Sequence, residues 1–332
     1  MPAARVLVLS ATASAINIIK SLRGEPDIEL FVSDANRFAG GLYEPGVTPV
    51  ILPRARDSAA YRAALDHIIA ACSIDILLPT SDHDMAAIVR LLSGGWDPPV
   101  RMFRPSPDAH RLLADKLALA ERLWRCGIPV PQTWSGVAAA HYPAVVKPLH
   151  EGGGKGVVVV RDRAEAEAAV RRAVAQYGPD CLVQEYIPGG IGATLMALLL
   201  YDPSGGIRCN TVMQSSLTYY TWGAGGNAGR IIDDPELREL AEAAVAACGG
   251  WRGPVCVEFR RHAETGRPYI IEVNCRLNGY SYLTTMNGLN YPRAMLALLC
   301  GEEPPVMSLP QETLCRNFVL GFREKVVEQW VR

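Results

Sequence analysis

The sequence predicts a mixed α/β protein in which a Rossmann-like unit precedes an α+β part. Apolar strand-like runs and amphipathic helix-like segments alternate over the first hundred residues, which is typical of βαβ units and a parallel sheet. A proline-rich passage at residues 96–107 interrupts this alternation and marks a boundary, because proline forbids a continuous helix. After residue 142, strand-like runs are joined by short turn-forming segments, which is typical of antiparallel sheets.

The elements of the N-terminal unit follow from this alternation. We expect strands over 5–10, 29–34 and 75–79, and helices over 15–22, 61–72 and 85–92. Ligands of parallel sheets bind beyond the carboxyl ends of the strands, which here carry Ser10, Asp34 and the segment 80–84. Asp34 lies about where a ribose-binding acid of a dinucleotide site would sit. The first turn reads SATASA without G-x-G-x-x-G, so a scaffold sheet that walls a substrate cleft is favoured.

The elements beyond the boundary are predicted in the same way. Ser106 or Asp108 can cap the first helix, which ends at Gly127. The expected elements are a helix over 109–126, strands over 144–148 and 157–161, a helix over 163–177, strands over 181–187, 194–201 and 207–215, a helix over 235–248, and strands over 254–260 and 268–273.

Composition excludes several classes of protein. The chain has 332 residues with 33 basic and 34 acidic side chains, so charge gives no reason to expect a nucleic acid or membrane-surface partner. Nine cysteines without a C-x-x-C pair argue against a disulfide framework or a cysteine-rich zinc site and favour the cytoplasm. We find no apolar run long enough to span a bilayer and expect no signal peptide.

A glycine-rich loop follows the strand over 144–148. Four glycines at 152, 153, 154 and 156 surround Lys155, and glycines let backbone N–H groups approach phosphate oxygens while a lysine adds a cation. The run lacks the G-K-[ST] of a Walker A loop, and a flexible hairpin tip is the alternative interpretation. Lys147 lies in the apolar strand before the loop, where a lysine needs a partner or a ligand unless it faces solvent.

A second feature is a pair of glutamates in a hairpin. If the turn is centred on Thr265, Glu258 and Glu272 lie opposite each other, and like charges across a strand pair are destabilising unless a divalent cation lies between them. Asn274 shares their face, and the resulting all-oxygen set suits Mg²⁺ or Mn²⁺. Arg276 would face the same way and stabilise charge on a transferred phosphoryl group. A solvent-facing polar strand is the alternative.

Together these features resemble the ATP-grasp superfamily, in the branch similar to carbamoyl-phosphate synthetase domains and carboxylate–amine ligases. The resemblance covers roughly residues 100–300. It rests on five motifs in order, which are Asp115-Lys116, Val145-Val146-Lys147-Pro148, the 152–156 loop, Gln184-Glu185-Tyr186-Ile187-Pro188-Gly189, and Glu258 with Glu272-Val273-Asn274-Cys275-Arg276. It implies a Rossmann-like pre-ATP-grasp domain over 1–100 and a two-lobed ATP-grasp fold. The N-terminal lobe over 101–185 would carry the glycine-loop hairpin, and the C-terminal lobe over 186–332 the metal site.

The resemblance also implies a role for each motif. Lys116 and Lys147 would contact the nucleotide phosphates, and Arg276 and Lys155 would act at the reacting phosphate. The remaining implied contacts are with the triphosphate for Gly152, Gly153, Gly154 and Gly156, with adenine for Gln184, Glu185, Tyr186 and Ile187, and with Mg²⁺ or Mn²⁺ for Glu258, Glu272 and Asn274.

The activity implied is an ATP-dependent ligation. ATP would phosphorylate a small carboxylate, and an amine would attack the acyl phosphate to give an amide, ADP and phosphate. An amino acid is the expected substrate for at least one half, and a homodimer is the default oligomer. Two alternatives stay open, a carbamoyl-phosphate-type kinase and a nucleotide-binding module without catalysis.

Several segments depart from the family pattern or invite other interpretations. The stretch 188–194 after the hinge carries no acid, so the ribose contact is unassigned. The polar, aromatic segment 213–227 is either a substrate loop or a connector, and Tyr280, Tyr282 and Asn287 are candidates for the same cleft. His83 is interpreted as an exposed loop residue, and alternation points Cys275 away from the metal strand face.

Overall fold

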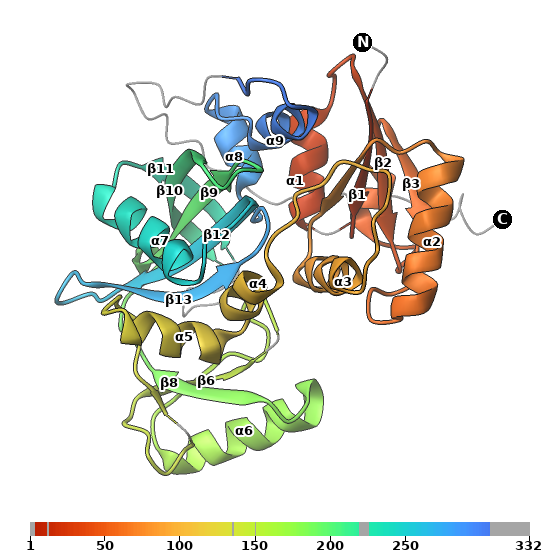
Figure 1. Ribbon diagram of the computed structural model, residues 1–332. Coiled ribbons are helices and arrows are strands. Elements are labelled where there is room, and N and C mark those ends of the chain that lie inside the picture. Colours follow the sequence, from red (N-terminus) through yellow and green to blue (C-terminus); the bar gives the residue numbers. More distant parts are fainter. Residues whose placement is uncertain (1–3, 12, 135, 150, 219–225, 306–332) are drawn as a thin grey trace.

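The computed structural model describes residues 4–11, 13–134, 136–149, 151–218 and 226–305 (Figure 1). These residues form three sheets with helices packed on them. In Figure 1 the N-terminal sheet lies on one side, the largest sheet lies next to it, and a smaller lobe with α6 projects below. No helix of the described chain is long and apolar enough to cross a membrane.

The N-terminal sheet is parallel, with the strand order β3-β2-β1-β4. Its elements are β1 (Ala4–Leu9), α1 (Ala13–Leu22), β2 (Ile28–Asp34), the 3-10 helix η1 (Gly40–Tyr43), β3 (Val47–Ile51), α2 (Ser58–Ala71), β4 (Ile76–Pro79) and α3 (Asp82–Ser93). The sequence analysis missed β3, a short edge strand that contains Pro49, where proline costs no ladder bond. Arg101 bridges to Ile76 of β4, so the proline-rich passage returns to this sheet.

The helix expected over 109–126 is wrong as a single element. The chain forms α4 (Pro107–Ala114) and α5 (Lys116–Arg125), separated by Asp115 in an extended conformation. The Asp115 side chain accepts hydrogen bonds from the backbone N–H groups of Leu117 and Ala118, both at 2.9 Å. Asp115 is therefore an N-cap, and it starts the second helix at Lys116.

The largest sheet is antiparallel, with the order β11-β10-β9-β12-β13. Its strands are β9 (Thr194–Tyr201), β10 (Ile207–Thr218), β11 (Gly226–Ile232), β12 (Gly253–Arg261) and β13 (Pro268–Asn274). Every residue of β9 is buried, because each face of the sheet is covered. Leu195, Ala197 and Leu199 pack in the core with α4, α5 and α7 (Pro235–Ala247).

The opposite face of β9 packs against the remaining helices. Met196, Leu198 and Leu200 share a core with α8 (Ser281–Met286), α9 (Tyr291–Cys300) and α1 of the N-terminal unit. Because α1 belongs to this shared core and contacts α8 and α9, the N-terminal unit packs onto the helices that cover this face of the largest sheet.

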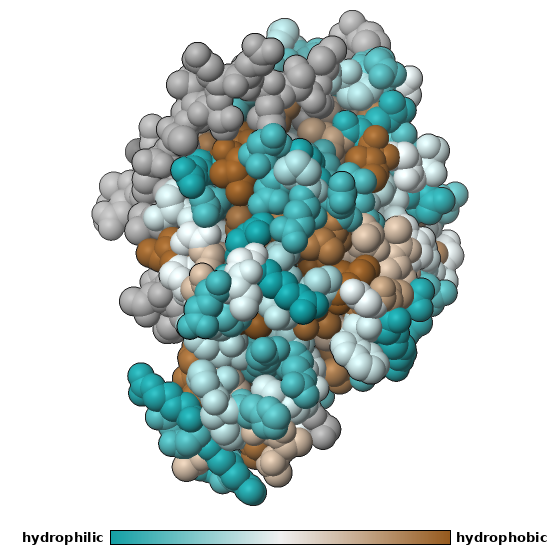
Figure 2. All heavy atoms as spheres, turned by 90° about the vertical axis from the view of Figure 1, so that its left-hand side faces the viewer, coloured by the Kyte–Doolittle hydropathy of each residue, from teal (hydrophilic) through white to brown (hydrophobic). Residues whose placement is uncertain are grey.

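The smaller lobe is an antiparallel sheet covered by one helix. Its sheet order is β5-β8-β6-β7, from β5 (Thr133–Trp134), β6 (Ala144–Pro148), β7 (Val158–Val160) and β8 (Cys181–Glu185), with α6 (Arg163–Tyr177) packed on it. The 3-10 helix η2 (Ile191–Ala193) follows β8. Hydrophilic residues cover much of the molecular face in Figure 2, where apolar residues form smaller separate areas.

Candidate active site

A cavity of about 360 Å³ lies between the largest sheet and the sheet of the smaller lobe. Strands of both sheets line it, and so do Ser14 of α1 and the segment after β13. The sequence-predicted residues that line it are Lys116, Lys147, Gly153, Gly154, Gln184, Glu185, Tyr186, Ile187, Glu258, Glu272 and Arg276.

Lys147 is a buried cation on β6. The residue is only 7% exposed. Its Nζ donates to the Ile271 carbonyl at 3.1 Å. Burial lowers the pKa of Lys147 to about 8, although the negative charge of Glu272 opposes this shift. A buried ammonium that lines a cavity is suited to bind an anion, since an anionic ligand would compensate the charge.

Lys116, the first residue of α5, anchors the start of the glycine loop. Its Nζ donates to the carbonyls of Leu149 at 3.1 Å and Glu151 at 2.8 Å. The same Nζ lies 3.8 Å from Oε2 of Glu272. The helix start that Asp115 fixes therefore places one cation between the glycine loop and the carboxylate hairpin.

Glu258 of β12 is paired to Glu272 of β13, as predicted, and the register shifts by one residue between Glu258 and Phe259. Asn274 donates from Nδ2 to Oε1 of Glu258 at 2.8 Å. Burial and the charge of Glu272 raise the pKa of Glu258 to about 7, against the opposing charge of Arg276. Two carboxylates that repel each other inside a cavity fit a divalent cation, which would keep both ionised.

The candidate metal set is therefore two carboxylates with an amide oxygen. In the described residues no group of three or more His, Cys, Asp and Glu side chains is arranged for a metal ion. The Oδ1 of Asn274 accepts from Nη2 of Arg276 at 3.0 Å, so this oxygen is shared between Arg276 and the candidate site.

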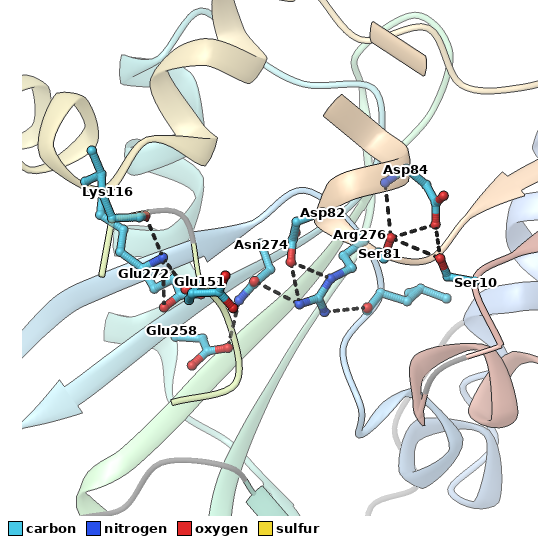
Figure 3. A network of polar contacts seen from close by, with 12 residues as sticks. Ser10, Ser81, Asp82, Asp84, Lys116, Glu151, Glu258, Glu272, Asn274 and Arg276 are labelled. Atoms are coloured by element: carbon cyan, nitrogen blue, oxygen red, sulfur yellow. Dashed lines mark hydrogen bonds and ion pairs between the residues drawn. The ribbon is translucent and has the colours of Figure 1, made fainter. Parts of the chain in front are cut away.

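Arg276 joins the cavity to the N-terminal unit through a residue that the sequence analysis did not select. Its Nε and Nη2 donate to Oδ2 of Asp82 at 3.0 and 2.8 Å, as Figure 3 shows. Asp82 is the first residue of α3, and the available signal was its place in the polar segment 80–84 after β4. The Asp82–Arg276 pair fixes the arginine in the cavity.

The hinge after β8 also lines the cavity, through Glu185, Tyr186 and Ile187. Glu185 Oε2 accepts from the backbone N–H of Gln132 at 3.0 Å, so this carboxylate holds neighbouring chain segments together. The Ile187 carbonyl accepts from Nε of Arg260 at 2.7 Å, and the Arg260 guanidinium lies 5.9 Å from the Tyr186 ring centroid. Arg260 was missed because it follows Phe259 in an apolar strand without a motif of its own.

Four predicted residues lie outside the cavity lining. Asn274 is buried behind Glu258, Lys155 is exposed, and Gly152 faces Asp82. Gly156 has a φ of +71°, and a Cβ there would meet Pro148 at 2.7 Å. Gly156 therefore has a packing reason of its own, and the implied roles of all four residues stay predictions.

The other candidates divide between the cavity and the protein interior. Tyr280 lines the cavity and lies with its hydroxyl 3.3 Å from Oγ of Ser215, which also lines it. Asn287 donates to the Leu283 carbonyl at 2.8 Å, and Tyr282 packs under Lys20. The segment 213–227 is described only in part, because residues 219–225 lie outside the described residues. The buried Cys275 belongs to the core around α7, as alternation predicted.

The chain is similar to known proteins in both sequence and fold. The family described as "ATP-grasp domain" matches residues 113–280, which is about half of the chain. A D-alanine–D-alanine ligase of Gloeobacter violaceus is 30% identical over 188 residues, covering 49% of this chain and 57% of the relative. The matched regions of the curated relatives span 27% to 57% of those proteins.

Two solved structures illustrate the likeness in fold. The β,γ-ATP complex of biotin carboxylase from Campylobacter jejuni has a TM-score of 0.70 at 20% identity, over 91% of this chain and 72% of that one. The L-amino acid ligase from Bacillus licheniformis has a TM-score of 0.69 at 19% identity, over 90% and 75%. At these identities the likeness shows the fold alone.

Proposed function

The chain belongs to the ATP-grasp family, and we propose that it is an ATP-dependent ligase that joins a small carboxylic acid to an amine. The observation that carries this proposal is one cavity lined by two lysines, two opposed glutamates and Arg276. Such a set can neutralise a nucleotide triphosphate and the charge of a phosphoryl group in transfer.

ATP and Mg²⁺ fit the chemistry of the cavity. Lys147 and Lys116 would hold phosphate oxygens under Gly153 and Gly154, while the hinge from Gln184 to Ile187 would hold adenine. Glu258 and Glu272, assisted by Asn274, would hold Mg²⁺, which when bound neutralises charge between phosphate oxygens. Lys155 and Arg276 are the proposed groups at the reacting phosphate.

The chemistry proposed needs positioning more than covalent participation by the protein. A carboxylate oxygen of the acid attacks the γ-phosphorus, the bond to the β-phosphate oxygen breaks, and ADP leaves. The amine nitrogen then attacks the acyl carbon, phosphate leaves, and the amine loses a proton. Arg276 is placed to stabilise negative charge, because Asp82 and Asn274 fix its guanidinium.

The finer parts of the proposal rest on the family and on the packing. We propose an amino acid as one substrate, a cytoplasmic location and the domain division 1–100, 101–185 and 186–332, with a Rossmann-like first domain. All eight cysteines in the described residues are free thiols, which is compatible with a reducing compartment. Small-molecule acids and amines are the proposed partners, and a homodimer is the proposed assembly.

A pooled turnover assay tests this function. Pools of amino acids and other small carboxylates, with and without added amines, are incubated with Mg-ATP and analysed for ADP, AMP and new masses. We expect ADP together with a product mass equal to acid plus amine minus water. AMP and pyrophosphate would contradict an acyl phosphate, and a carbamoyl phosphate product from bicarbonate would support the kinase alternative instead.

A further inference from the structure

A second, larger cavity of about 620 Å³ lies in the N-terminal unit, at the carboxyl ends of the parallel strands. Residues that end or follow all four strands line it, among them Ser10 after β1, Asp34 of β2, Arg54 after β3 and Ser81 after β4. The sheet order places β1 beside β4, so the strand order reverses at this point. Open parallel sheets bind ligands at such a switch point.

One residue that lines this cavity, Ser10, has a strained backbone. Ser10 has a φ of +61°, a left-handed conformation that a non-glycine residue keeps only where its surroundings fix it. Its hydroxyl donates to the buried carboxylate of Asp84. Asp84 also accepts from the hydroxyls of Ser81 at 2.6 Å and Tyr61 at 2.8 Å, as the right-hand part of Figure 3 shows for the two serines.

Three carboxylates line the cavity, those of Asp34, Asp84 and Glu151, and the first two are stabilised by neutral local donors. Asp84 has its three hydroxyl partners, and Asp34 accepts from the backbone N–H groups of Ala11 at 2.9 Å and Asn36 at 2.7 Å. Asp34 and Asp84 are therefore stabilised by hydrogen bonds from the protein itself. Neither carboxylate forms an ion pair with an arginine of the cavity in the described structure.

The arginines of the same cavity have few partners of their own. Arg54, Arg56 and Arg90 all line it and are exposed. Among the described residues, the Arg90 side chain donates only to the Ala55 carbonyl, at 3.5 Å, and Arg56 lies 4.0 Å from the exposed Asp57. For Arg54, no side-chain hydrogen bond or ion pair is found with any described residue. The cavity thus offers guanidinium groups that an anion would satisfy.

This cavity is connected to the candidate active site by two contacts. Glu151 at the start of the glycine loop lines both cavities. In addition, α3 contributes His83 and Asp84 to the N-terminal cavity, while its first residue, Asp82, holds Arg276 of the active site. An occupant of the N-terminal cavity would lie within one helical turn of the residue that fixes Arg276.

We infer that the N-terminal cavity is a binding site for a small molecule with a carboxylate or phosphate group, which Arg54 and Arg90 would hold. The inference rests on the proposed function only for the source of that molecule. It is either the acid-bearing second substrate of the ligase or an effector that acts through α3 and Glu151.

Binding is tested on the full chain with defined probes. L-glutamate, L-aspartate, succinate, citrate, glycerol 3-phosphate and inorganic phosphate are measured by saturation-transfer NMR, with Mg-ADP present to occupy the active site. The test variant is Arg54→Ala/Arg90→Ala. The control is Arg62→Ala, an exposed arginine of α2 that pairs with Asp66 at 3.6 Å and does not line this cavity.

We expect at least one probe to bind the wild type and Arg62→Ala equally, and the double variant at least tenfold more weakly. No binding of any probe to the wild type would overturn the inference. Equal binding by a double variant with unchanged thermal unfolding would overturn it as well. A charge-reversing variant, Arg54→Glu, should weaken binding further if the arginine contacts the anion directly.

The source of the molecule is then distinguished by adding Mg-ATP. Incorporation of the bound probe into a product mass identifies a substrate, whereas changed ATP turnover without consumption of the probe identifies an effector. Arginine-dependent binding would stand even if no ligase turnover were found, so failure of the proposed function is a separate result. Ligase turnover with no probe bound would overturn only this inference.

Discussion

The N-terminal cavity and the cavity between the two sheets both contain carboxylates, and these carboxylates have different kinds of partner in the two places. In the N-terminal unit, Asp84 is 4% exposed and accepts hydrogen bonds from Ser10, Ser81 and Tyr61. The donors are neutral hydroxyls that come from three elements, with Ser10 after β1, Tyr61 in α2 and Ser81 at the N-cap of α3. This carboxylate is satisfied without any ligand.

In the β12–β13 hairpin the carboxylates are instead opposed to one another. Glu258 and Glu272 are register partners, with one amide donor from Asn274 and one lysine at 3.8 Å. Burial raises the pKa of both Asp84 and Glu258. For Asp84 its three hydroxyl partners oppose this shift, whereas for Glu258 the like charge of Glu272 adds to it, so the opposed pair is poorly satisfied alone. A buried carboxylate whose hydrogen bonds are all made stabilises the fold, whereas an opposed pair of carboxylates in a cavity suits a cation.

The largest expected effect separates the opposed pair from ordinary surface acids. Glu272→Gln removes one negative charge from the candidate cation site, and we expect turnover to fall by about 10²–10³-fold, as for loss of one preorganised electrostatic group. The matched control is Glu264→Gln, at an exposed turn position of the same hairpin, which should keep turnover within about twofold. Steady-state ADP release measures both, and equal losses would contradict the assignment.

The next effect concerns the satisfied carboxylate. Asp84→Asn replaces an acceptor of three hydroxyls with an amide that can accept fewer, and we expect the free energy of unfolding to fall by about 1–3 kcal/mol. Urea denaturation in the absence of nucleotide measures this change. An unchanged urea midpoint would mean that the hydrogen bonds of Asp84 do not stabilise the fold, and the proposed difference between the two cavities would be wrong.

A smaller effect is expected where the two regions meet. Asp82→Asn keeps the shape of the side chain but removes the charge that faces Arg276, and we expect kcat to fall about tenfold, or roughly 1.4 kcal/mol, with little change in KM for ATP. Asp108→Asn, which removes the exposed partner of Arg111 at 3.5 Å, is the control. A change in KM alone would show that Asp82 acts on nucleotide binding and not on the position of Arg276.

The smallest effect is a pH dependence of stability. The pKa of Glu258 is raised from 4.5 to about 7 in the folded protein, so folding favours its protonated form, and without metal this group lowers stability as pH rises from 4.5 towards 7. The melting temperature of the metal-free wild type should therefore fall more between pH 5 and 8 than that of Glu258→Gln, by about 1–3 °C. An identical pH dependence in both proteins would show that Glu258 is not responsible.

The sequence predicted the glutamate pair correctly, but turn symmetry is only part of the reason. A turn centred on Thr265 places Glu258 opposite Glu272, as found, whereas next to the turn the strands pair one residue off that centre, with Phe259 opposite Ile270. An irregularity between Glu258 and Phe259 shifts the register, and no sequence pattern predicted it.

For Lys147 the apolar strand predicted a need for a partner or ligand with a solvent-facing position as the alternative, and the residue is buried. Motif order then fixed the family, which the match over residues 113–280 confirms.

The contacts between distant segments could not be predicted in this way. Asp82 and Arg276 are 194 residues apart, and no local pattern relates them. The break at Asp115 was missed because the helical periodicity continues across it, while the cap depends on the conformation of a single residue. Burial of Lys116 against Leu149 and Glu151 likewise depends on how the smaller lobe packs.

Glu258 and Glu272 are proposed to form the cation site of the cavity between the two sheets. Binding of Mn²⁺, followed by electron paramagnetic resonance in the presence of ADP, tests this proposal most directly on the wild type, Glu272→Gln and Asp84→Asn. The account predicts that Glu272→Gln binds Mn²⁺ at least tenfold more weakly while Asp84→Asn keeps the wild-type affinity. Equal affinity in the wild type and Glu272→Gln would contradict it.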